Sequence, residues 1–243
     1  LSEERYGKYL IPKYRDEIFL MTKTYSTDAK TARKHLGGSL RRLNTDVIDL
    51  WQVHTLQTPG DVDKRIDNGV LEVIEEAKKS GKVRYVGCTG HNNPDAHERM
   101  LERTEASFFD TCQFPVNVLD AGAEHSFINT LMQRLMDRNT GILAMKTLAD
   151  GRFFNKKVQQ GEVIWDTNNP VVPGQINIED ALSFAWSLPI SVLITGAENP
   201  QLLREKVNMA KRFEKMSEKE RHALVEKVAD ISNRKDVEYY KNV

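Results

Sequence analysis

The sequence has no net charge, little cysteine and no long apolar run. Its 35 basic and 35 acidic residues cancel, so nothing indicates a polyanion-binding surface, and we expect no nucleic-acid partner. Because no run of about 18 uninterrupted apolar residues occurs, we also expect no insertion into a membrane. Cys88 and Cys112 are the two cysteines, and each lies within an apolar, strand-like run. That position fits packed thiols better than a disulfide framework.

The 243 residues suit one α/β barrel or two small domains. We expect a single barrel domain over residues 1–243. Six short apolar runs alternate with helix-like segments, which is the pattern of parallel strands and covering helices. These runs are residues 18–21, 47–53, 83–88, 110–114, 142–145 and 192–194. A closed (β/α)₈ TIM barrel needs eight strands, so the sequence predicts such a barrel with its first two strands absent from the chain.

Helix boundaries follow from capping residues. Ser2 is a plausible N-cap for a helix to about Leu10, and Ile11-Pro12 should end it because proline cannot continue the hydrogen-bond ladder. Thr27 or Asp28 can cap the next helix, Asn93-Pro94 another, and Ser217 to Glu220 has the spacing of a capping box. The segment from about Leu148 to Ile176 lacks periodicity, which favours a functional loop, with a disordered surface excursion as the rival interpretation.

Polar residues stand where the predicted strands end. They are Lys23, His54, Thr89, Gln113, Lys146 and Thr195. In a parallel barrel the carboxyl ends of the strands converge on the face where active sites are built. Each residue also has an ordinary explanation. A strand-end lysine can reach water, a loop histidine can be satisfied locally, and a buried glutamine can bond neighbouring backbone.

The order and spacing of several motifs resemble the aldo-keto reductase superfamily almost from end to end. The motifs are Ser2-Glu3-x-x-x-Gly7-x-x-Leu10, Phe19 to Lys23, Asp46-x-x-Asp49-Leu50-x-x-x-His54, Gly81 to Gly87, Gln113-x-x-x-Asn117, Leu148-x-x-Gly151 and Thr195-Gly196-Ala197. The resemblance implies an NAD(P)H-dependent reductase of aldehydes or ketones on a (β/α)₈ barrel.

The resemblance implies a catalytic tetrad of Asp, Tyr, Lys and His. Lys23 matches its lysine and His54 its histidine. The family's tyrosine and aspartate would fall before Leu1, and Tyr6 and Tyr9 do not match the tyrosine in register. The tyrosine hydroxyl donates a proton to the carbonyl oxygen while hydride reaches the carbon. A nearby lysine cation lowers the phenol's pKa from about 10, and the histidine orients the carbonyl.

The resemblance also implies a cofactor site. Its residues would be Thr89, Gln113, Met145, Lys146, Thr147, Leu148, Gly151, Gly196, Ala197, Gln201 and Glu205. Several positions depart from the family pattern: Gly90 replaces an asparagine, Met145 a stacking aromatic residue, Lys146 a serine and Lys206 another asparagine. Lys146 brings a positive charge to where the cofactor's pyrophosphate should pass. Gly196 and Leu202 stand where Lys and Arg hold the 2′-phosphate of NADP, and Glu198 is close by. A carboxylate repels phosphate, so both NADP and NAD stay open.

Two other functions are compatible with the sequence. Lys23 or Lys146 could form a Schiff base, as in a TIM-barrel aldolase, or the chain could be a non-catalytic, cofactor-binding regulatory relative. We expect a small-molecule carbonyl substrate, with sugar-derived compounds among the candidates, and a monomer or small homo-oligomer. His91, His125 and the 148–176 loop could shape the substrate pocket. Cytoplasm is the expected location, with periplasm as the alternative if an export signal precedes Leu1.

Overall fold

The computed structural model describes residues 2–159, 161–166, 168, 170, 172 and 174–241. Contacts divide the chain into two compact units, each described below by itself. Unit 1 comprises Leu1–Cys112 and Arg138–Thr140, and unit 2 comprises Gln113–Asp137 and Gly141–Val243. This division does not show whether residues 1–243 fold as one domain, so the single barrel domain stays a prediction.

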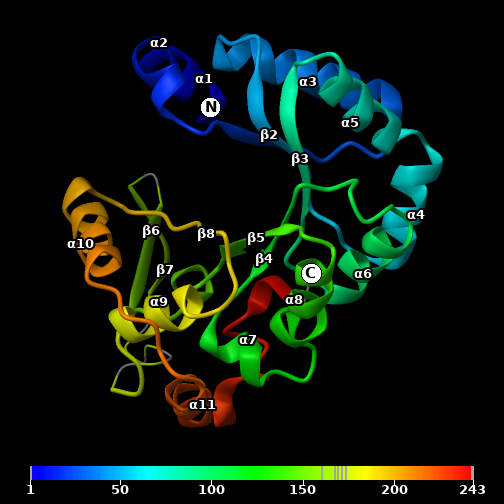
Figure 1. Cartoon of the computed structure of the whole chain (residues 1–243). Coiled ribbons are helices and arrows are strands. Elements are labelled where there is room, and N and C mark those ends of the chain that lie inside the picture. Colours follow the sequence, from blue (N-terminus) through cyan, green and yellow to red (C-terminus); the bar gives the residue numbers. More distant parts are fainter. Residues whose placement is uncertain are drawn as a thin grey trace. The chain divides into compact units, whose positions relative to one another are not determined.

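Unit 1 is built on three parallel strands, β1 (Met21–Thr24), β2 (Ile48–Val53) and β3 (Val83–Thr89), in that order. All six residues of β2 are buried, which is expected for a parallel strand covered on both faces. Helices α3 (Ala29–Leu43) and α5 (Val70–Lys79) pack against each other, and α5 packs on β3 (Figure 1). Asp28 caps α3 by accepting a hydrogen bond from Thr31 N, as the sequence predicts.

The helix at the start of unit 1 does not end at Ile11-Pro12, so that prediction is wrong. After α1 (Ser2–Arg5) the chain makes a π-helical turn, Tyr6–Leu10, and continues as α2 (Ile11–Tyr14) and a 3₁₀ turn, Arg15–Glu17. Pro12 falls in the first turn of α2, where a missing N–H is tolerated. The strand expected at residues 18–21 likewise begins later, at Met21.

Two shorter helices complete unit 1. Helix α4 (Pro59–Asp67) was not predicted, because its apolar face is narrow and it follows a Pro/Gly-containing loop. Helix α6 (Pro94–Glu102) is capped by Asn93 as predicted. The two helices contact each other, and Arg99 of α6 binds Asp63 of α4 through two hydrogen bonds. Strand β4 (Thr111–Pro115) begins at the end of unit 1.

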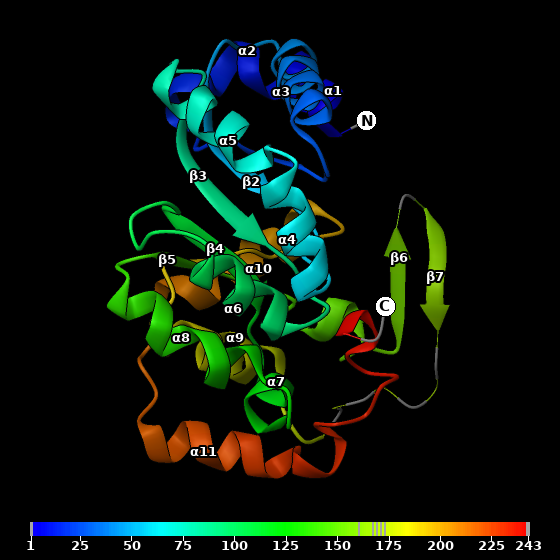
Figure 2. The ribbon, with the colours of Figure 1, turned by 90° about the vertical axis from the view of Figure 1, so that its right-hand side faces the viewer.

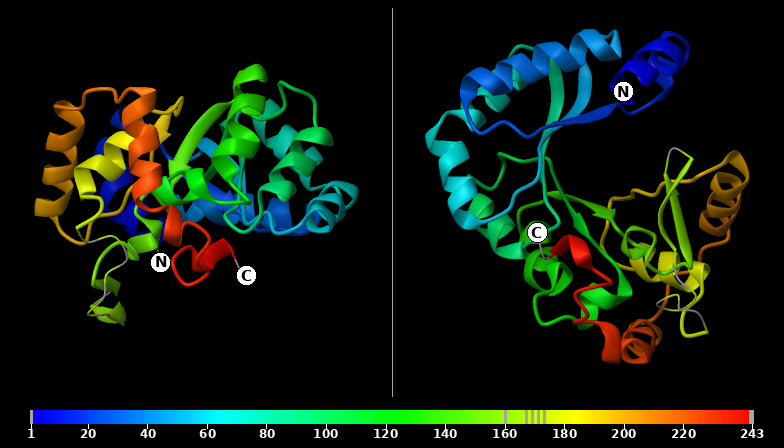
Figure 3. Two further views of the ribbon diagram at one scale, coloured as in Figure 1. Left: turned by 90° about the horizontal axis from the view of Figure 1, so that it is seen from below. Right: turned by 180° about the vertical axis from the view of Figure 1, so that it is seen from behind.

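Unit 2 pairs β5 (Gly141–Met145) with β8 (Val192–Leu193) in parallel. Its helices are α7 (Val118–Gly122), α8 (Phe127–Asp137), α9 (Ile178–Trp186), α10 (Pro200–Lys211) and α11 (Glu218–Lys227). Three 3₁₀ turns occupy Ala149–Gly151, Ala229–Ile231 and Tyr239–Lys241. Helix α11 carries the predicted capping box between Ser217 and Glu220, and it packs against α7 (Figure 3).

The segment expected to be an irregular loop contains a β-hairpin. Strands β6 (Lys156–Gln159) and β7 (Glu162–Asp166) pair in antiparallel fashion, with a register irregularity at Lys157/Val158 (Figure 2). The sequence signal was weak because charged and polar residues interrupt both strands. The hairpin occupies part of the 148–176 segment, and the predicted role of that segment in substrate binding stays a prediction.

The two cysteines behave as packed thiols. Cys88 on β3 and Cys112 on β4 are free and fully buried, with their sulfur atoms 3.7 Å apart. Within the part of the chain that the structure describes, no helix is long and apolar enough to cross a membrane. The parallel strands with alternating helices confirm the α/β fold class.

Candidate active site

Lys23 lies in β1, one residue before that strand ends. Its neighbour in the sheet register is Gln52 of β2. Burial lowers the pKa of the Lys23 ammonium group below its usual value, since desolvation disfavours a charged amine. No salt bridge to Lys23 occurs among the described residues, so it is a desolvated cation at a strand end.

His54 is the first residue after β2, as predicted. Burial, together with the charges of Lys23, His91 and Arg65, lowers the pKa of His54 from 6.5 to about 4. That electrostatic effect requires Lys23 and His54 to lie near each other. The imidazole is therefore neutral at neutral pH and can donate a hydrogen bond from one ring nitrogen.

The backbone after His54 is fastened to both neighbouring strands. His54 N donates to Thr24 O of β1 at 2.7 Å, and Leu56 N donates to Thr89 O of β3 at 3.1 Å. Between them, Thr55 has a φ of 59°, a left-handed conformation that a β-branched residue seldom adopts. The hydrogen bonds to β1 and β3 therefore hold this turn in a backbone conformation that threonine does not favour.

Gly90, which follows Thr89, has no room for a side chain. A Cβ atom there would lie 2.6 Å from Leu56 O and 2.8 Å from the His97 ring. The asparagine that the family pattern has at this position would collide with the turn after His54. The departure at Gly90 therefore follows from the close approach of that turn to β3.

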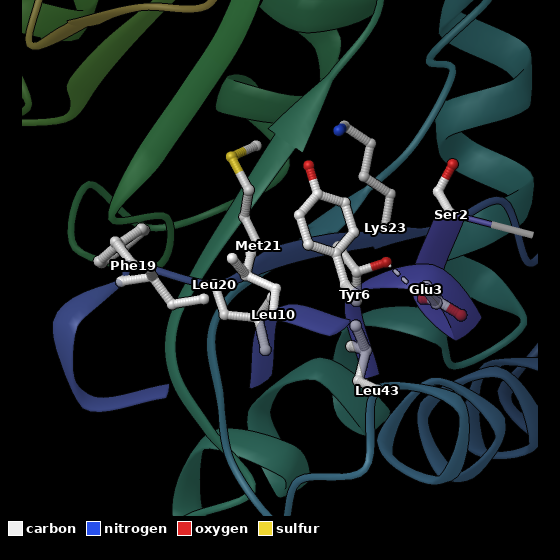
Figure 4. A pocket seen from close by; sticks show the side chains of 11 residues that line it. Ser2, Glu3, Tyr6, Leu10, Phe19, Leu20, Met21, Lys23 and Leu43 are labelled. Carbon is white, nitrogen blue, oxygen red and sulfur yellow. Dashed lines mark hydrogen bonds between the residues drawn. The ribbon is translucent and has the colours of Figure 1, made fainter. Parts of the chain in front are cut away.

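A cavity of about 390 Å³ opens beside β1 (Figure 4). Its wall is formed by Ser2, Glu3, Tyr6, Leu10, Ile18, Phe19, Leu20, Met21, Thr22, Lys23 and Leu43. In Figure 4 the side chains of Lys23, Tyr6 and Met21 extend in the same direction. Glu3 accepts a hydrogen bond from Thr22 Oγ1 at 2.6 Å. Lys23 lines this cavity and His54 does not, so the cavity touches only one member of the candidate pair.

In unit 2, Gln113 lies in contact with Met145, the last residue of β5. Gln113 stands in the middle of β4 and not at its end, so its predicted place at a strand end is wrong, because β4 continues to Pro115. The Gln113 amide nitrogen lies 3.1 Å from the Met145 sulfur. The Gln113 side-chain oxygen is buried and has no hydrogen-bond partner among the described residues. A buried acceptor without a partner is costly, and the carboxamide N–H of a nicotinamide would satisfy it. The chemistry of this pair therefore fits the predicted cofactor.

The turn after β5 centres on Asp150. Lys146 and Lys157 bind its two carboxylate oxygens at 3.1 and 2.6 Å, and Tyr239 donates a hydrogen bond to it. Burial alone would raise the pKa of Asp150, but these partners lower it below its usual value. Burial and, after it, the hydrogen bond to the Asp150 carboxylate raise the pKa of Tyr239 to about 12. Lys146, predicted to meet a phosphate, is already paired.

The turn after β8 holds the remaining predicted cofactor residues. Lys206 of α10 donates to Thr195 Oγ1 at 2.9 Å and to Gly196 O at 2.5 Å. Gln201 donates to Glu205 at 3.1 Å within α10. A Cβ at Gly196 would meet nothing within 4 Å. Lys206, which departs from the family pattern, therefore holds Thr195 and Gly196, the first two residues of this turn. Ala197 is the next residue.

Sequence reasoning missed three residues that shape these sites. Gln52 is fully buried in register with Lys23, and neither polar atom of its side chain has a partner among the described residues. Arg65 binds the backbone at His54, and Asp150 pairs with Lys146. An inward-facing amide two residues before His54 was a usable signal for Gln52. The other two depend on contacts that no local pattern reveals.

Asp49, part of the quoted motif, has a structural role. It is 1% exposed at the start of β2, where its carboxylate accepts a hydrogen bond from Leu20 N at 2.7 Å. Arg15 and Arg84 pair with it at 2.9 and 2.6 Å. It lies at the opposite end of β2 from His54. Asp49 therefore stabilises the sheet, and its contacts indicate no catalytic role.

Parallel strands alternating with helices, with a desolvated lysine and a neutral histidine at the ends of neighbouring strands, define an α/β protein with a candidate catalytic pair. Residues 1–229 match the profile described as "Aldo/keto reductase family". The chain belongs to the aldo/keto reductase family. Its fold is similar to that of aldo-keto reductase AKR11C1 from Bacillus halodurans in the holo form, with a TM-score of 0.70 and 21% identity over 93% of this chain and 76% of that one.

Curated relatives carry the names of oxidoreductases. "L-galactose dehydrogenase" of Arabidopsis thaliana is 25% identical over 70% of this chain and 53% of its own length. "6-dehydroglucose reductase" of Novosphingobium aromaticivorans is 25% identical over 72% and 57%. "Uncharacterized oxidoreductase YrpG" of Bacillus subtilis is 27% identical over 65% and 52%. The chain spans just over half the length of these curated relatives.

Proposed function

We propose that this protein is an NAD(P)H-dependent oxidoreductase that reduces an aldehyde or ketone to an alcohol. The observation that carries the proposal is the pairing of Lys23 with His54, two desolvated groups at neighbouring strand ends, in which the charge of Lys23 helps to lower the pKa of His54. A neutral His54 can donate a hydrogen bond to a carbonyl oxygen, which orients and polarises it. The ammonium of Lys23 lowers the pKa of a phenol placed beside it.

The phenol in this proposal is the tetrad tyrosine, which the family resemblance assigns to a position before Leu1, with the tetrad aspartate earlier still. Nicotinamide, when bound, supplies the hydride. Gln113 would hold its carboxamide through the side-chain oxygen that lacks a partner among the described residues. The family resemblance also assigns Thr89 of unit 1 to the cofactor, and Met145 and the turns at residues 146–151 and 195–197 of unit 2. The adenosine end of the cofactor would contact Gln201 and Glu205. Both NADP and NAD are candidates for this cofactor.

Sugar-derived carbonyls come first in the substrate panel, because the names of two relatives refer to sugars. The test follows oxidation of NADPH and of NADH by the purified protein with sugar-derived and simple aldehydes and ketones. Turnover with at least one carbonyl, lost in Lys23→Met and His54→Ala, supports the proposal. Tight cofactor binding without turnover over the whole panel would instead favour the regulatory relative.

One observation also favours a Schiff-base aldolase. The lowered pKa of Lys23 increases the fraction of free amine, which is the nucleophile in such enzymes. Lys146 fits this role less well, because it is paired with Asp150. Borohydride treatment in the presence of a keto substrate should leave Lys23 unmodified if the reductase proposal holds. A trapped adduct on Lys23 would replace the reductase by the aldolase.

A further inference from the structure

Arg65 of α4 is a buried arginine to which the family resemblance gave no role. Its residue exposure is 4%. Asp61, one helical turn earlier, faces it, with Arg65 Nε 2.9 and 3.0 Å from the two carboxylate oxygens. Since burying an unpaired guanidinium would be costly, Asp61 supplies the charge that allows Arg65 to lie inside unit 1.

The rest of the guanidinium binds backbone carbonyl groups in two loops. Nη1 donates to His54 O at 2.8 Å and to Ser26 O at 3.4 Å, and Nη2 donates to Thr55 O at 3.1 Å. Ser26 follows β1, which carries Lys23, and His54 follows β2. One side chain thus ties together the two loops that come after the strands of the candidate pair.

The shape of arginine suits this task. Its five N–H groups lie in one plane and point in fixed directions, whereas lysine offers a point charge on a flexible stem. Asp61 extends the network, because it also accepts a hydrogen bond from Gln57 N at 3.3 Å. Residues 54–57 are therefore held by Arg65 directly and through Asp61.

We propose that Arg65 is a positioning residue that fixes the backbone of His54 and Thr55 against the loop after β1, and thereby holds the His54 imidazole beside Lys23. Thr55 needs such support because its φ of 59° is unfavourable for threonine. The catalytic meaning of this inference rests on the proposed reductase function. The positioning itself does not, and it can be measured on His54 directly.

The charged groups that act on His54 are Lys23 on β1, His91 after β3 and Arg65 on α4. All of them favour the neutral imidazole. Removing the Arg65 charge should therefore raise the pKa of His54, while replacing it by lysine should keep the pKa close to its original value. The hydrogen-bonded fork is lost in both variants, so the two effects can be separated.

The test compares Arg65→Met and Arg65→Lys with Arg99→Met as the matched control. Arg99 binds Asp63 between α6 and α4 through two hydrogen bonds but does not touch His54. We expect both Arg65 variants to lower kcat by about 10- to 100-fold with little change in KM, because small misplacements of a catalytic group are costly. Only Arg65→Met should raise the pKa of His54, read by NMR titration of its ring. Arg99→Met should change neither.

If Arg65→Met does not fold, Arg65→Lys and Asp61→Asn carry the same test, the latter by freeing Arg65 from its carboxylate. A wild-type kcat and an unchanged His54 ring resonance in the Arg65 variants would overturn the inference. If the wild-type protein reduces no carbonyl compound, the proposed function fails on its own. The NMR comparison then still decides whether Arg65 positions His54.

Discussion

A charged side chain holds the turn after β2 in unit 1, and another holds the turn after β5 in unit 2. The first charge is buried and positive, and the second is half-buried and negative. At the first turn, the Arg65 cation binds carbonyl oxygens of the backbone. At the second, the Asp150 anion binds the side chains of Lys146 and Lys157. Both turns contain non-glycine residues with positive φ, Thr55 in one and Lys146, Ala149 and Asp150 in the other.

The difference decides which side chains remain reactive. Arg65 binds the backbone carbonyl groups of His54 and Thr55, so the charge that holds the first turn leaves the His54 side chain unpaired with it. Asp150 instead pairs with the very side chain that the sequence assigns to a cofactor phosphate. Under the proposed function, the side chains of Lys23 and His54 stay available to a substrate, whereas Lys146 would meet a phosphate only if its pair with Asp150 were broken or shared.

The largest expected effect is at Lys23. Lys23→Met should lower kcat/KM for the best carbonyl substrate by about 10²- to 10⁴-fold, the usual contribution of assisted proton transfer. It should also raise the pKa of His54, because the nearby cation is gone. Steady-state kinetics and NMR titration measure the two effects, with Lys30→Met, an exposed lysine on α3, as the control. Activity within a few-fold of wild type would remove Lys23 from the mechanism.

Acid should destabilise unit 1 through His54. The folded-state pKa of about 4 lies below the ordinary value of 6.5, so the neutral form is preferred on folding. This contribution is complete above pH 6.5 and is lost as the pH falls toward 4. Allowing for partial solvent exposure, it amounts to about 1–3 kcal/mol.

Urea unfolding between pH 7.5 and 4 would measure this loss of stability, with His54→Gln as the comparison. The variant should lose distinctly less stability over the same range. Equal acid sensitivity in the two proteins would mean that His54 is not desolvated in the folded state.

A helix-capping pair gives a smaller effect, confined to unit 2. Asn177 caps α9 by accepting from Asp180 N at 2.7 Å, and Asn199 caps α10 by accepting from Leu202 N at 2.9 Å. Four residues of α9 are buried, whereas α10 has none among the described residues. Asn177→Ala should cost about 1 kcal/mol of unfolding free energy, and Asn199→Ala less, because a solvent-facing helix can fray locally. Thermal unfolding of both variants would show an equal loss if this reasoning fails.

The smallest effect is expected at Asp150. Asp150→Asn removes the anion that competes with phosphate for Lys146 and Lys157, so cofactor affinity should rise by about two- to fivefold, the size of a modest charge effect. The salt dependence of binding should become steeper as well. Fluorescence titration with NADPH and NADH measures both. Weaker binding would show that Asp150 serves mainly to order the turn.

Much of the fold followed from local pattern. All six predicted strands occur with boundaries shifted by up to three residues, and Asp28, Asn93 and Ser217 cap the helices assigned to them. These features depend on neighbours in sequence: apolar runs favour buried strands, and short polar side chains satisfy the free N–H groups at helix starts. Two predictions failed because contacts beyond the local sequence decided the structure. At Pro12 a wider, π-helical turn lets the helix continue, and α4 forms where it packs against α6.

By itself, the sequence determined the alternation of strands and helices, the packing of the two cysteines as free thiols and the placement of Lys23 and His54 at strand ends. Tertiary structure alone decided how those ends are held. Arg65 reaches Ser26 across 39 positions and Tyr239 reaches Asp150 across 89, and such contacts leave no periodic trace in the chain. A buried charge acquires its partners, and hence its effect on a neighbouring pKa, only when distant segments are brought together and water is excluded.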